Sequence, residues 1–211
     1  MIFVTVGSQL GFDRMVGAVA AWARARGTGM HGTGTHGTGM HGGTHGGTHG
    51  GTHGTGMHAA GGTQGSTHGS TQGTGMHAAE GTRMFFQTGA TKVDLAGFEH
   101  MPVLSAEEIR RKFDEATLVV AHAGTGTIIE CMLRGKPVIV MPRSASLHET
   151  RNDHQFATAR RFQARGGVFV AWDETELAAL LDRASTLTGG AAIQAHADQR
   201  LLDALRAFVA G

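Results

Sequence analysis

"LVVAHAGTGTIIECMLRGKPVIVMP", residues 118–142, is the stretch that decides the fold. It opens with a continuous apolar run at residues 118–121, which is typical of a strand that is covered on both faces. A helical pattern follows and ends at Gly135, and "KPVIVMP" then has the composition of another buried strand. Two buried strands with a helix between them predict a βαβ unit, in which the two strands lie parallel.

The same alternation of strands and helices continues on both sides of this unit. Ser105 with Glu108, and Asp173 with Glu176, have the spacing of helix-capping pairs ahead of helical patterns. Further short strands are predicted at residues 2–6, 84–89, 93–101 and 168–172. This order predicts an α/β fold, a Rossmann-like parallel sheet with helices on both faces.

A final helix is predicted over residues 192–209. Ile193, Leu201, Leu205 and Phe208 fall on one face of it. The simplest interpretation is that this apolar stripe packs into the core, and the alternative is a docking surface for a partner protein.

Residues 27–82 form a low-complexity insert of a different composition from the rest of the chain. This segment holds 21 of the 34 glycines and 9 of the 14 histidines, with no Val, Ile, Leu, Phe or Trp. Such a segment has almost nothing to bury, and its glycines lose much backbone entropy on ordering, so we expect disorder. Residues 1–26 and 83–211 then make up a single domain.

Repeats in the insert leave one functional alternative open. "GGTHGGTHGGTH" has a period of four residues, and "GTGMHAA" occurs at residues 54–60 and again at 73–79. His41, His45, His49 and His53 could bind Zn²⁺ or Ni²⁺ as a flexible tract. We prefer expansion of a short repeat without a specific metal site.

Composition excludes several classes of protein. The formal net charge is +1, which gives no electrostatic reason to expect nucleic acid as a partner. Cys131 is the only cysteine, so no internal disulfide is possible. No apolar run approaches the ~20 residues that span a bilayer. We therefore expect a soluble, cytoplasmic chain that works at a membrane only through a partner.

Three loops that leave strands carry polar or glycine-rich sequence: residues 7–9, 122–127 and 142–152. In an open parallel sheet such loops share the edge at which ligands bind. A helix that begins within "HAGTGT" directs unpaired amides at an anion, and His122 can donate to a phosphate when neutral or add charge when protonated. Glu130, further along that helix, can accept bonds from two ribose hydroxyls. The pattern favours a nucleotide diphosphate, although a Gly-Thr-Gly turn, a core histidine and a solvated glutamate are each common by themselves.

Four segments outside the insert resemble the C-terminal domain of glycosyltransferase family 28. They are "MIFVTVGSQLGFDRMV" (1–16), "FFQTG" (85–89), "LVVAHAGTGTIIECMLRGKPVIVMPR" (118–143) and "HETRNDHQFATARRF" (148–162). Within the family, the chain resembles the small bacterial exopolysaccharide subunits described as β-1,4-glucuronosyltransferase subunits. It is more distantly similar to the eukaryotic two-subunit N-acetylglucosaminyltransferases.

The resemblance implies the donor-binding half of a GT-B glycosyltransferase. Such a half binds a UDP-sugar, and inverting transfer to a lipid-linked saccharide needs a separate membrane-associated subunit that holds the acceptor. That subunit would recruit this cytoplasmic chain to the inner face of the membrane. No Asp-x-Asp motif occurs, so we expect no essential metal and no cofactor besides the UDP-sugar substrate.

Motif matching assigns roles to twelve residues. Glu130 would hold the ribose, and His122 would face the diphosphate together with Gly124, Thr125, Gly126 and Thr127. Asn152, His154 and Gln155 would lie against the donor sugar or ribose, and Gly7, Ser8 and Gln9 would close the phosphate side. The general base is expected on the missing subunit, with His122 and His154 as the candidates within this chain.

Simpler interpretations apply to other residues. Cys131 is expected in the core, and Arg160 and Arg161 on a solvated helix face. Arg143 could reach a uronate carboxylate, but an exposed loop arginine is the preferred interpretation. Two rival functions remain: a non-catalytic nucleotide-sugar-binding module, and a metal-binding protein acting through the insert.

Overall fold

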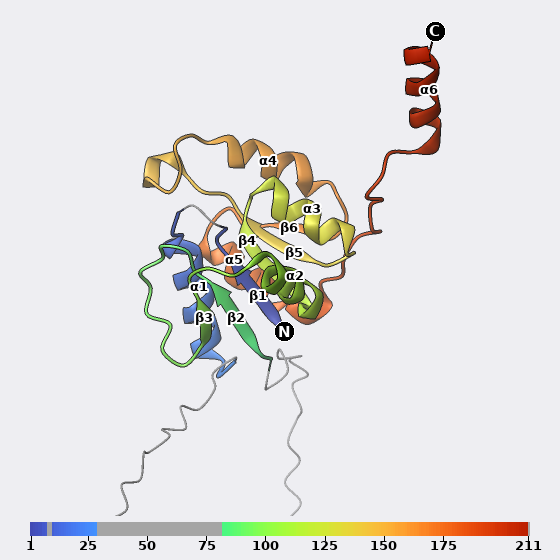
Figure 1. The fold of residues 1–211 in the computed structure, drawn as a ribbon. Coiled ribbons are helices and arrows are strands. Elements are labelled where there is room, and N and C mark those ends of the chain that lie inside the picture. Colours follow the sequence, from blue (N-terminus) through green and yellow to red (C-terminus); the bar gives the residue numbers. More distant parts are fainter. Residues whose placement is uncertain (8–9, 29–81, 211) are drawn as a thin grey trace, which may run out of the picture. The chain divides into compact units, whose positions relative to one another are not determined.

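A computed structural model describes residues 1–7, 10–28 and 82–210. These contain six strands in one sheet. The strands are β1 (Ile2–Thr5), β2 (Met84–Gln87), β3 (Glu99–Met101), β4 (Leu118–His122), β5 (Val138–Met141) and β6 (Val168–Val170). Every adjacent pair is parallel, and the order across the sheet is β3-β2-β1-β4-β5-β6 (Figure 1). The predicted Rossmann-like α/β fold is confirmed.

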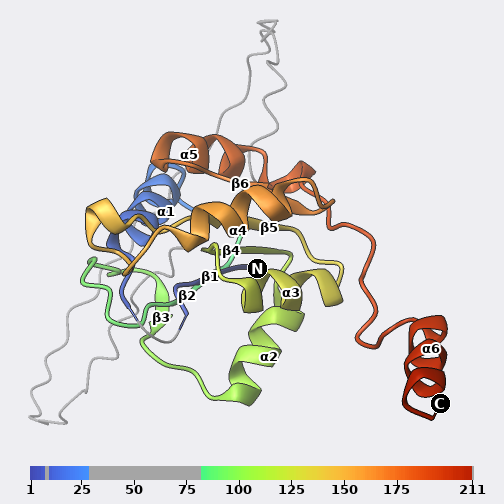
Figure 2. The same cartoon turned by 90° about the horizontal axis from the view of Figure 1, so that it is seen from above.

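Six α-helices accompany the described strands. They are α1 (Asp13–Ala25), α2 (Ala106–Glu115), α3 (Thr125–Leu133), α4 (His154–Gln163), α5 (Glu174–Asp182) and α6 (Gln199–Ala210). Short 3-10 turns cover Ala145–Leu147 and Ala184–Thr186. Helices α1 and α5 lie on one face of the sheet, and α2 and α3 on the other (Figure 2).

Alternating side chains of the strands build a core on each face of the sheet. Ile2 and Val4 pack with α1 and α5, whereas Phe3 packs into the cluster that includes residues of α2, α3 and α4. Phe3 and Val4 are fully buried. Strands buried on both faces need apolar residues at successive positions, which explains the continuous apolar runs in the sequence.

The order of the strands reverses direction between β1 and β4, in the middle of the sheet. β1 lies between β2 and β4, so the chain runs outward from β1 in one direction to β3 and in the other to β6. Loops that leave the carboxyl ends of β1 and β4 therefore diverge, and such a switch point is where open α/β sheets bind ligands.

Both predicted capping pairs are confirmed. Ser105 accepts a hydrogen bond from the Glu108 amide, and the Glu108 carboxylate accepts one from the Ser105 amide. Asp173 accepts a bond from the amide of Glu176 at the start of α5. These bonds satisfy amides that have no partner within the helix.

Two residues that we assigned to the insert complete α1. Gly27 has φ +61°, and the amides of Gly27 and Thr28 donate to the carbonyls of Arg24 and Ala23. This is the Schellman arrangement, in which glycine adopts the left-handed conformation at low cost. The predicted disorder and the candidate metal ligands His41, His45, His49 and His53 lie outside the described residues.

Helix α6 differs from its prediction. It begins at Gln199 instead of residue 192, and none of its residues is buried. The apolar stripe is exposed: Leu201 and Leu205 are about half exposed, and Phe208 is 85% exposed. The prediction that this stripe packs into the core is therefore wrong.

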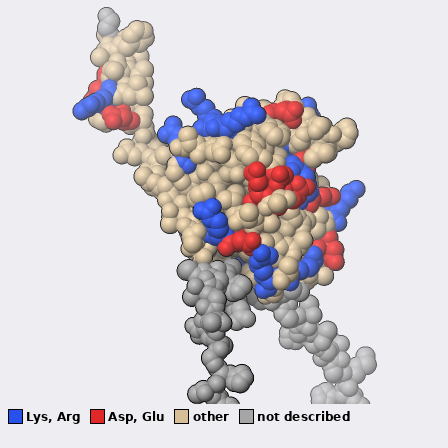
Figure 3. Space-filling model, turned by 180° about the vertical axis from the view of Figure 1, so that it is seen from behind, with Lys and Arg blue, Asp and Glu red and all other residues tan. Residues whose placement is uncertain are grey.

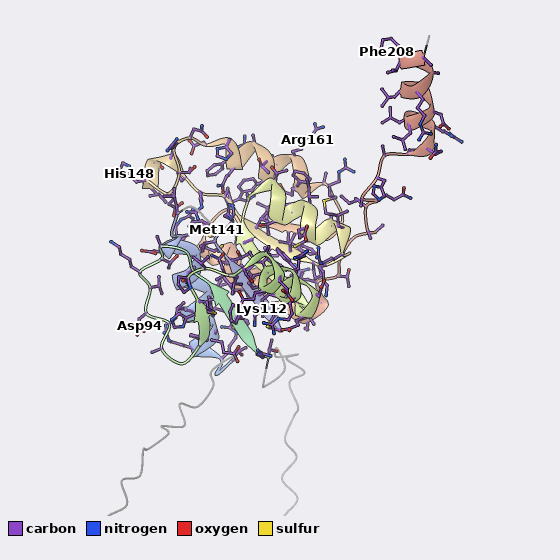
Figure 4. The ribbon with its side chains drawn as sticks, in the orientation of Figure 1. Asp94, Lys112, Met141, His148, Arg161 and Phe208 are labelled. Carbon is purple, nitrogen blue, oxygen red and sulfur yellow. The ribbon has the colours of Figure 1, made fainter. Side chains whose placement is uncertain are left out.

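Other features of the described surface follow the composition. Arg160 and Arg161 are exposed, as predicted, and Arg161 points away from α4 (Figure 4). Lys and Arg side chains lie among Asp and Glu side chains on the face shown in Figure 3, in keeping with a net charge near zero.

Cys131 is buried, as predicted, which raises the pKa of its thiol to about 12. Across the described ranges, no helix has the length and apolar character needed to cross a membrane.

Candidate functional site

A cavity of about 370 Å³ opens at the switch point, between the loops that follow β1, β4 and β5. Its walls combine residues from all three loops. They are Val6, Gly7, Leu10, His122, Gly124, Gly126, Thr127, Arg143, Thr150, His154 and Gln155. Seven of the twelve predicted site residues are therefore brought together here. Ser8 and Gln9 lie outside the described residues.

Helix α3 begins at this cavity without a side-chain cap. Gly124 is its N-cap residue, no side chain in the described part of the chain accepts a bond from the first-turn amides, and the first turn has no acidic residue. A Cβ placed on Gly126 would meet nothing within 4 Å, so the backbone is open to the cavity there. Thr127 adds a hydroxyl to the lining, whereas Thr125 is exposed and lines neither this cavity nor its neighbour. Uncapped amides and the positive end of the helix dipole together form a site for an anion.

The imidazole of His122 is held between two glycines. A Cβ on Gly7 would lie 2.8 Å from Cε1 of His122, and a Cβ on Gly124 would lie 2.3 Å from Nε2. Gly7 also has φ +77°, a conformation that favours glycine. The need for glycine at these two positions therefore comes from the histidine ring as well as from any ligand.

The protonation of His122 follows from this packing. Burial, helped by the positive charge of Arg143 and by His154, lowers the pKa of the imidazole from 6.5 to about 4. The ring is consequently neutral at physiological pH, which removes the predicted alternative of a charged imidazole. Its buried Nδ1 has no hydrogen-bond partner within residues 1–7, 10–28 and 82–210. An unsatisfied buried nitrogen at a cavity is where a ligand or an ordered water can complete the hydrogen bonding.

A second cavity of about 380 Å³ adjoins the first on the other side of the α3 N-terminus. Both are lined by Gly7, Gly126 and Thr127. The remaining walls of the second cavity are Gln87, Val103, Leu104, Ile109, Phe113 and Glu130. It is thus largely apolar, with one carboxylate and one amide side chain.

Glu130 lies in this second cavity and not beside His154. Its Oε1 accepts a bond of 2.6 Å from Arg134, one turn later on α3, and its side chain is one-third exposed. Arg134 in turn bonds Asp114 of α2 at 2.8 Å. The two bonds fix the position of the Glu130 carboxylate at the mouth of the cavity.

The predicted residues of the third loop divide between the cavity wall and its surroundings. His154 lines the first cavity, and its Nδ1 makes a short contact with Oδ1 of Asn152, which itself does not line the cavity. Gln155 is buried, and its Oε1 accepts a bond from the Arg143 amide. His148, at the tip of this loop, has φ +57°.

The sequence analysis misassigned Arg143 and missed Gln87. Arg143 is only 3% exposed, so the exposed-loop interpretation is wrong. Gln87, at the end of β2, is buried and donates to the carbonyls of Gly7 and Pro102 while accepting from the Thr5 hydroxyl. Gln87 is a polar residue that ends a buried strand, and this was the available signal for it. Within the described ranges, no group of three or more His, Cys, Asp or Glu side chains could hold a metal ion.

Comparison with known proteins places the chain in a family. The model of the glycosyltransferase family 28 C-terminal domain matches residues 76–187. The chain belongs to this family. The matched family segment contains the first turn of α3, Glu130, Arg143 and the third loop, but not Gly7.

Two curated relatives in the family share the same name. UDP-N-acetylglucosamine transferase subunit ALG13 of Eremothecium gossypii is 42% identical over 74 residues, which are 35% of this chain and 34% of that protein. The Mus musculus protein of that name is 30% identical over 63 residues, 30% of this chain and 5% of its own length. The match thus spans about a third of the first relative and a small part of the second.

Proposed function

We propose that this chain binds the UDP-sugar donor of a glycosyltransferase whose acceptor is held by a second subunit. The observation that carries the proposal is the pair of joined cavities at the uncapped N-terminus of α3. The groups of a nucleoside diphosphate sugar follow one another in a matching order. A largely apolar base with a ribose would correspond to the second cavity, two phosphates to the α3 N-terminus, and a polar sugar to the first cavity. Family membership supports this choice of ligand class.

Each part of the donor has a counterpart in the site. The base and ribose fit the second cavity, where apolar side chains flank the ring and Glu130 accepts from the ribose hydroxyls. The diphosphate then lies at the amides of residues 125–127, beside the Thr127 hydroxyl. The sugar extends into the first cavity toward His154 and Gln155.

The proposed reaction is inverting transfer. An acceptor hydroxyl attacks the anomeric carbon, the bond from that carbon to the UDP oxygen breaks, and its electron pair stays on the β-phosphate. The α3 amides, the Thr127 hydroxyl and one N–H of neutral His122 stabilise the charge that develops there, and removing one such donor typically costs ~10²–10³ in rate. We propose that no metal is needed. The acceptor proton passes to a base on the second subunit, with His154 as the candidate on this chain.

N-acetylglucosamine is our first candidate for the sugar. Both curated relatives are named for its transfer. A uronate would need a free cation, and the only Arg or Lys in the described lining of the first cavity is Arg143, whose guanidinium is committed to backbone carbonyls. Glucuronate transfer in exopolysaccharide synthesis, which the sequence resemblance implied, is therefore the second candidate.

A second subunit is part of the proposal. Both relatives are named as subunits, and the matching family model is that of a C-terminal domain. We propose that this partner is membrane-associated and holds a lipid-linked acceptor, and that it recruits the chain from the cytoplasm. The exposed apolar stripe of α6 is a described surface for such a partner to cover.

Calorimetric titration of the full chain tests the proposal. UDP, UDP-N-acetylglucosamine, UDP-glucuronate and Ni²⁺ are titrated separately into the wild type, Glu130→Ala and Glu107→Ala. Glu107 is an exposed glutamate of α2 and serves as the matched control. We expect UDP binding that is at least about tenfold weaker in Glu130→Ala only, since a hydrogen bond to a charged group contributes about 1.5–3 kcal/mol.

The other outcomes separate the rival functions. Ni²⁺ binding without UDP binding would favour the metal-binding protein. UDP binding without transfer to a lipid-linked acceptor, even when the second subunit is supplied, would favour the non-catalytic module. Tighter binding of UDP-glucuronate than of UDP-N-acetylglucosamine would reverse the order of the two sugars.

A further inference from the structure

Arg143 places a buried guanidinium beneath the first cavity. Its Nη1 donates to the carbonyls of Gly11 at 2.5 Å and Glu149 at 3.2 Å. Its Nη2 donates to the carbonyls of Val6 at 3.0 Å and Leu10 at 2.8 Å. One side chain thereby ties the loop after β1 to the loop after β5, the two loops that flank the cavity.

The charge of Arg143 has no carboxylate partner among the described residues. Glu149, the acidic residue whose backbone carbonyl Arg143 contacts, uses its carboxylate to accept from Arg14 at 2.8 and 2.9 Å and from the Ser144 amide at 2.9 Å. Arg14 also lies 3.6 Å from Glu174. Arg14 is therefore the neutralised arginine of this network. Among the described residues, the Arg143 guanidinium contacts only backbone carbonyl oxygens and the face of Phe12.

Burying a cation without a counter-ion is costly, and carbonyl dipoles offset only part of that cost. A protein that retains such a charge at the wall of a ligand cavity has a fixed positive potential there. In a site shielded from water, this potential acts on an anion over more than contact distance. Arg143 lines the same cavity as the N-terminus of α3 and His122.

We propose that Arg143 is a positioning residue that also supplies the fixed positive charge for the donor diphosphate. The guanidinium holds the two loops in place, and its field favours the diphosphate and the charge that develops on the leaving UDP. It acts without direct contact, because its N–H groups are occupied by the carbonyls. This inference rests on the proposed binding of a UDP-sugar.

A purely structural Arg143 would behave differently from a charged one. If it only held the loops, its loss would weaken every ligand of the cavities by a similar factor. If its charge matters, its loss weakens UDP far more than uridine, which lacks the phosphates. Arg14→Met is the matched control, because it removes an arginine of the same network whose charge is already neutralised.

The first experiment measures binding of UDP and of uridine to the wild type, Arg143→Met, Arg143→Lys and Arg14→Met. We expect Arg143→Met to weaken UDP about tenfold or more relative to uridine, given the size of charge interactions near a protein surface. Arg143→Lys should restore much of the ratio of UDP to uridine affinity, although it has fewer donors for the carbonyls. Arg14→Met should leave that ratio unchanged.

The second experiment needs no ligand. Burial is the main cause of the low pKa of His122, and the positive charge of Arg143 and the neighbouring His154 lower it further. In an NMR titration, Arg143→Met should therefore raise the pKa of His122, and Arg143→Lys should not. If Arg143→Met does not fold, Arg143→Gln replaces it in both experiments.

Equal losses of UDP and uridine affinity in the Arg143 variants would overturn the proposal, as would an unchanged pKa of His122. Absence of UDP binding by the wild type would instead contradict the proposed function, and the His122 titration would still test the charge. The two failures are thus distinguishable.

Discussion

The N-termini of α3 and α5 lie at the carboxyl edge of the same sheet but are built in opposite ways. α5 begins with Asp173, whose carboxylate accepts the Glu176 amide, and has acidic residues in its first turn. α3 begins with Gly124, has no side-chain cap and has no acidic residue in its first turn. A side-chain cap contributes about 1 kcal/mol to stability, so α3 gives up stability that α5 retains.

This difference teaches which helix end is reserved for a ligand. An amide that donates to no side chain is available to an outside anion, and an acidic first turn would repel that anion. Helix α2 follows the pattern of α5, with a full capping box at Ser105. α3 thus departs, where two cavities meet, from a local rule of helix stability that α2 and α5 obey, as expected of a functional site.

Giving α3 the acidic first turn of α5 should have the largest effect. Gly126→Asp places a carboxylate in open space at the meeting point of both cavities. We expect UDP affinity to fall about a thousandfold, because a like charge a few ångströms away costs roughly 4 kcal/mol near a protein surface. Thermal stability should stay equal or rise, since Asp suits a first turn better than Gly does.

Calorimetry and thermal unfolding check this result, with Gly126→Ala as a control that adds bulk without charge. A loss of affinity in Gly126→Asp no greater than in Gly126→Ala would show that charge at this helix end is unimportant.

The pH dependence of stability should show the next largest effect, through the histidine that packs against the α3 N-terminus. Unfolded His122 takes up a proton near pH 6.5, whereas the folded state does so only near its pKa of about 4. The unfolded state therefore binds more protons between these values, and stability falls as the pH is lowered through this window. The contribution present above pH 6.5 and lost by pH 4 is roughly 3 kcal/mol.

Urea unfolding at several pH values, for the wild type and His122→Gln, measures this contribution. His148→Gln is the matched control, because His148 is exposed on a loop. The interpretation is wrong if His122→Gln keeps the wild-type slope of stability against pH.

The packing of His122 between glycines gives a third, smaller effect. Gly124→Ala forces a methyl group against the ring, which Gly7 blocks from the other side, and such overpacking costs about 2 kcal/mol. In a His122→Ala background the same substitution should cost much less. A double-mutant cycle from urea unfolding measures the coupling, and strictly additive effects would contradict the predicted contact.

Some of this architecture was visible in the sequence because its causes are local. The Ser105 and Asp173 caps, the buried strands and the glycine-rich start of α3 each depend on a few neighbouring residues. The contact of Gly7 with His122 joins residues far apart in the chain, so no local pattern predicts it. Arg143 was misassigned because an arginine after a strand has the same pattern whether its guanidinium meets solvent or four backbone carbonyls.

The stripe of α6 was misassigned for a related reason. Leu201, Leu205 and Phe208 have the spacing of a core-facing helix, and spacing does not show what covers the face. Glu130 was correctly placed on α3, but its position in the second cavity depends on how α2 and α3 pack. Sequence patterns therefore predicted the elements well and their tertiary neighbours less well.

The smallest effect should come from breaking the α5 side of the comparison. Asp173→Ala removes the acceptor of the Glu176 amide and should lower the free energy of unfolding by about 1 kcal/mol, while Asp173→Asn should retain most of it. UDP affinity should not change in either variant, because Asp173 lines neither cavity. Urea unfolding and calorimetry on the same samples test both statements. If Asp173→Ala weakened UDP binding as strongly as it weakened the fold, the α3 and α5 ends would be energetically coupled, and the division between a stabilising and a ligand-binding helix end would fail.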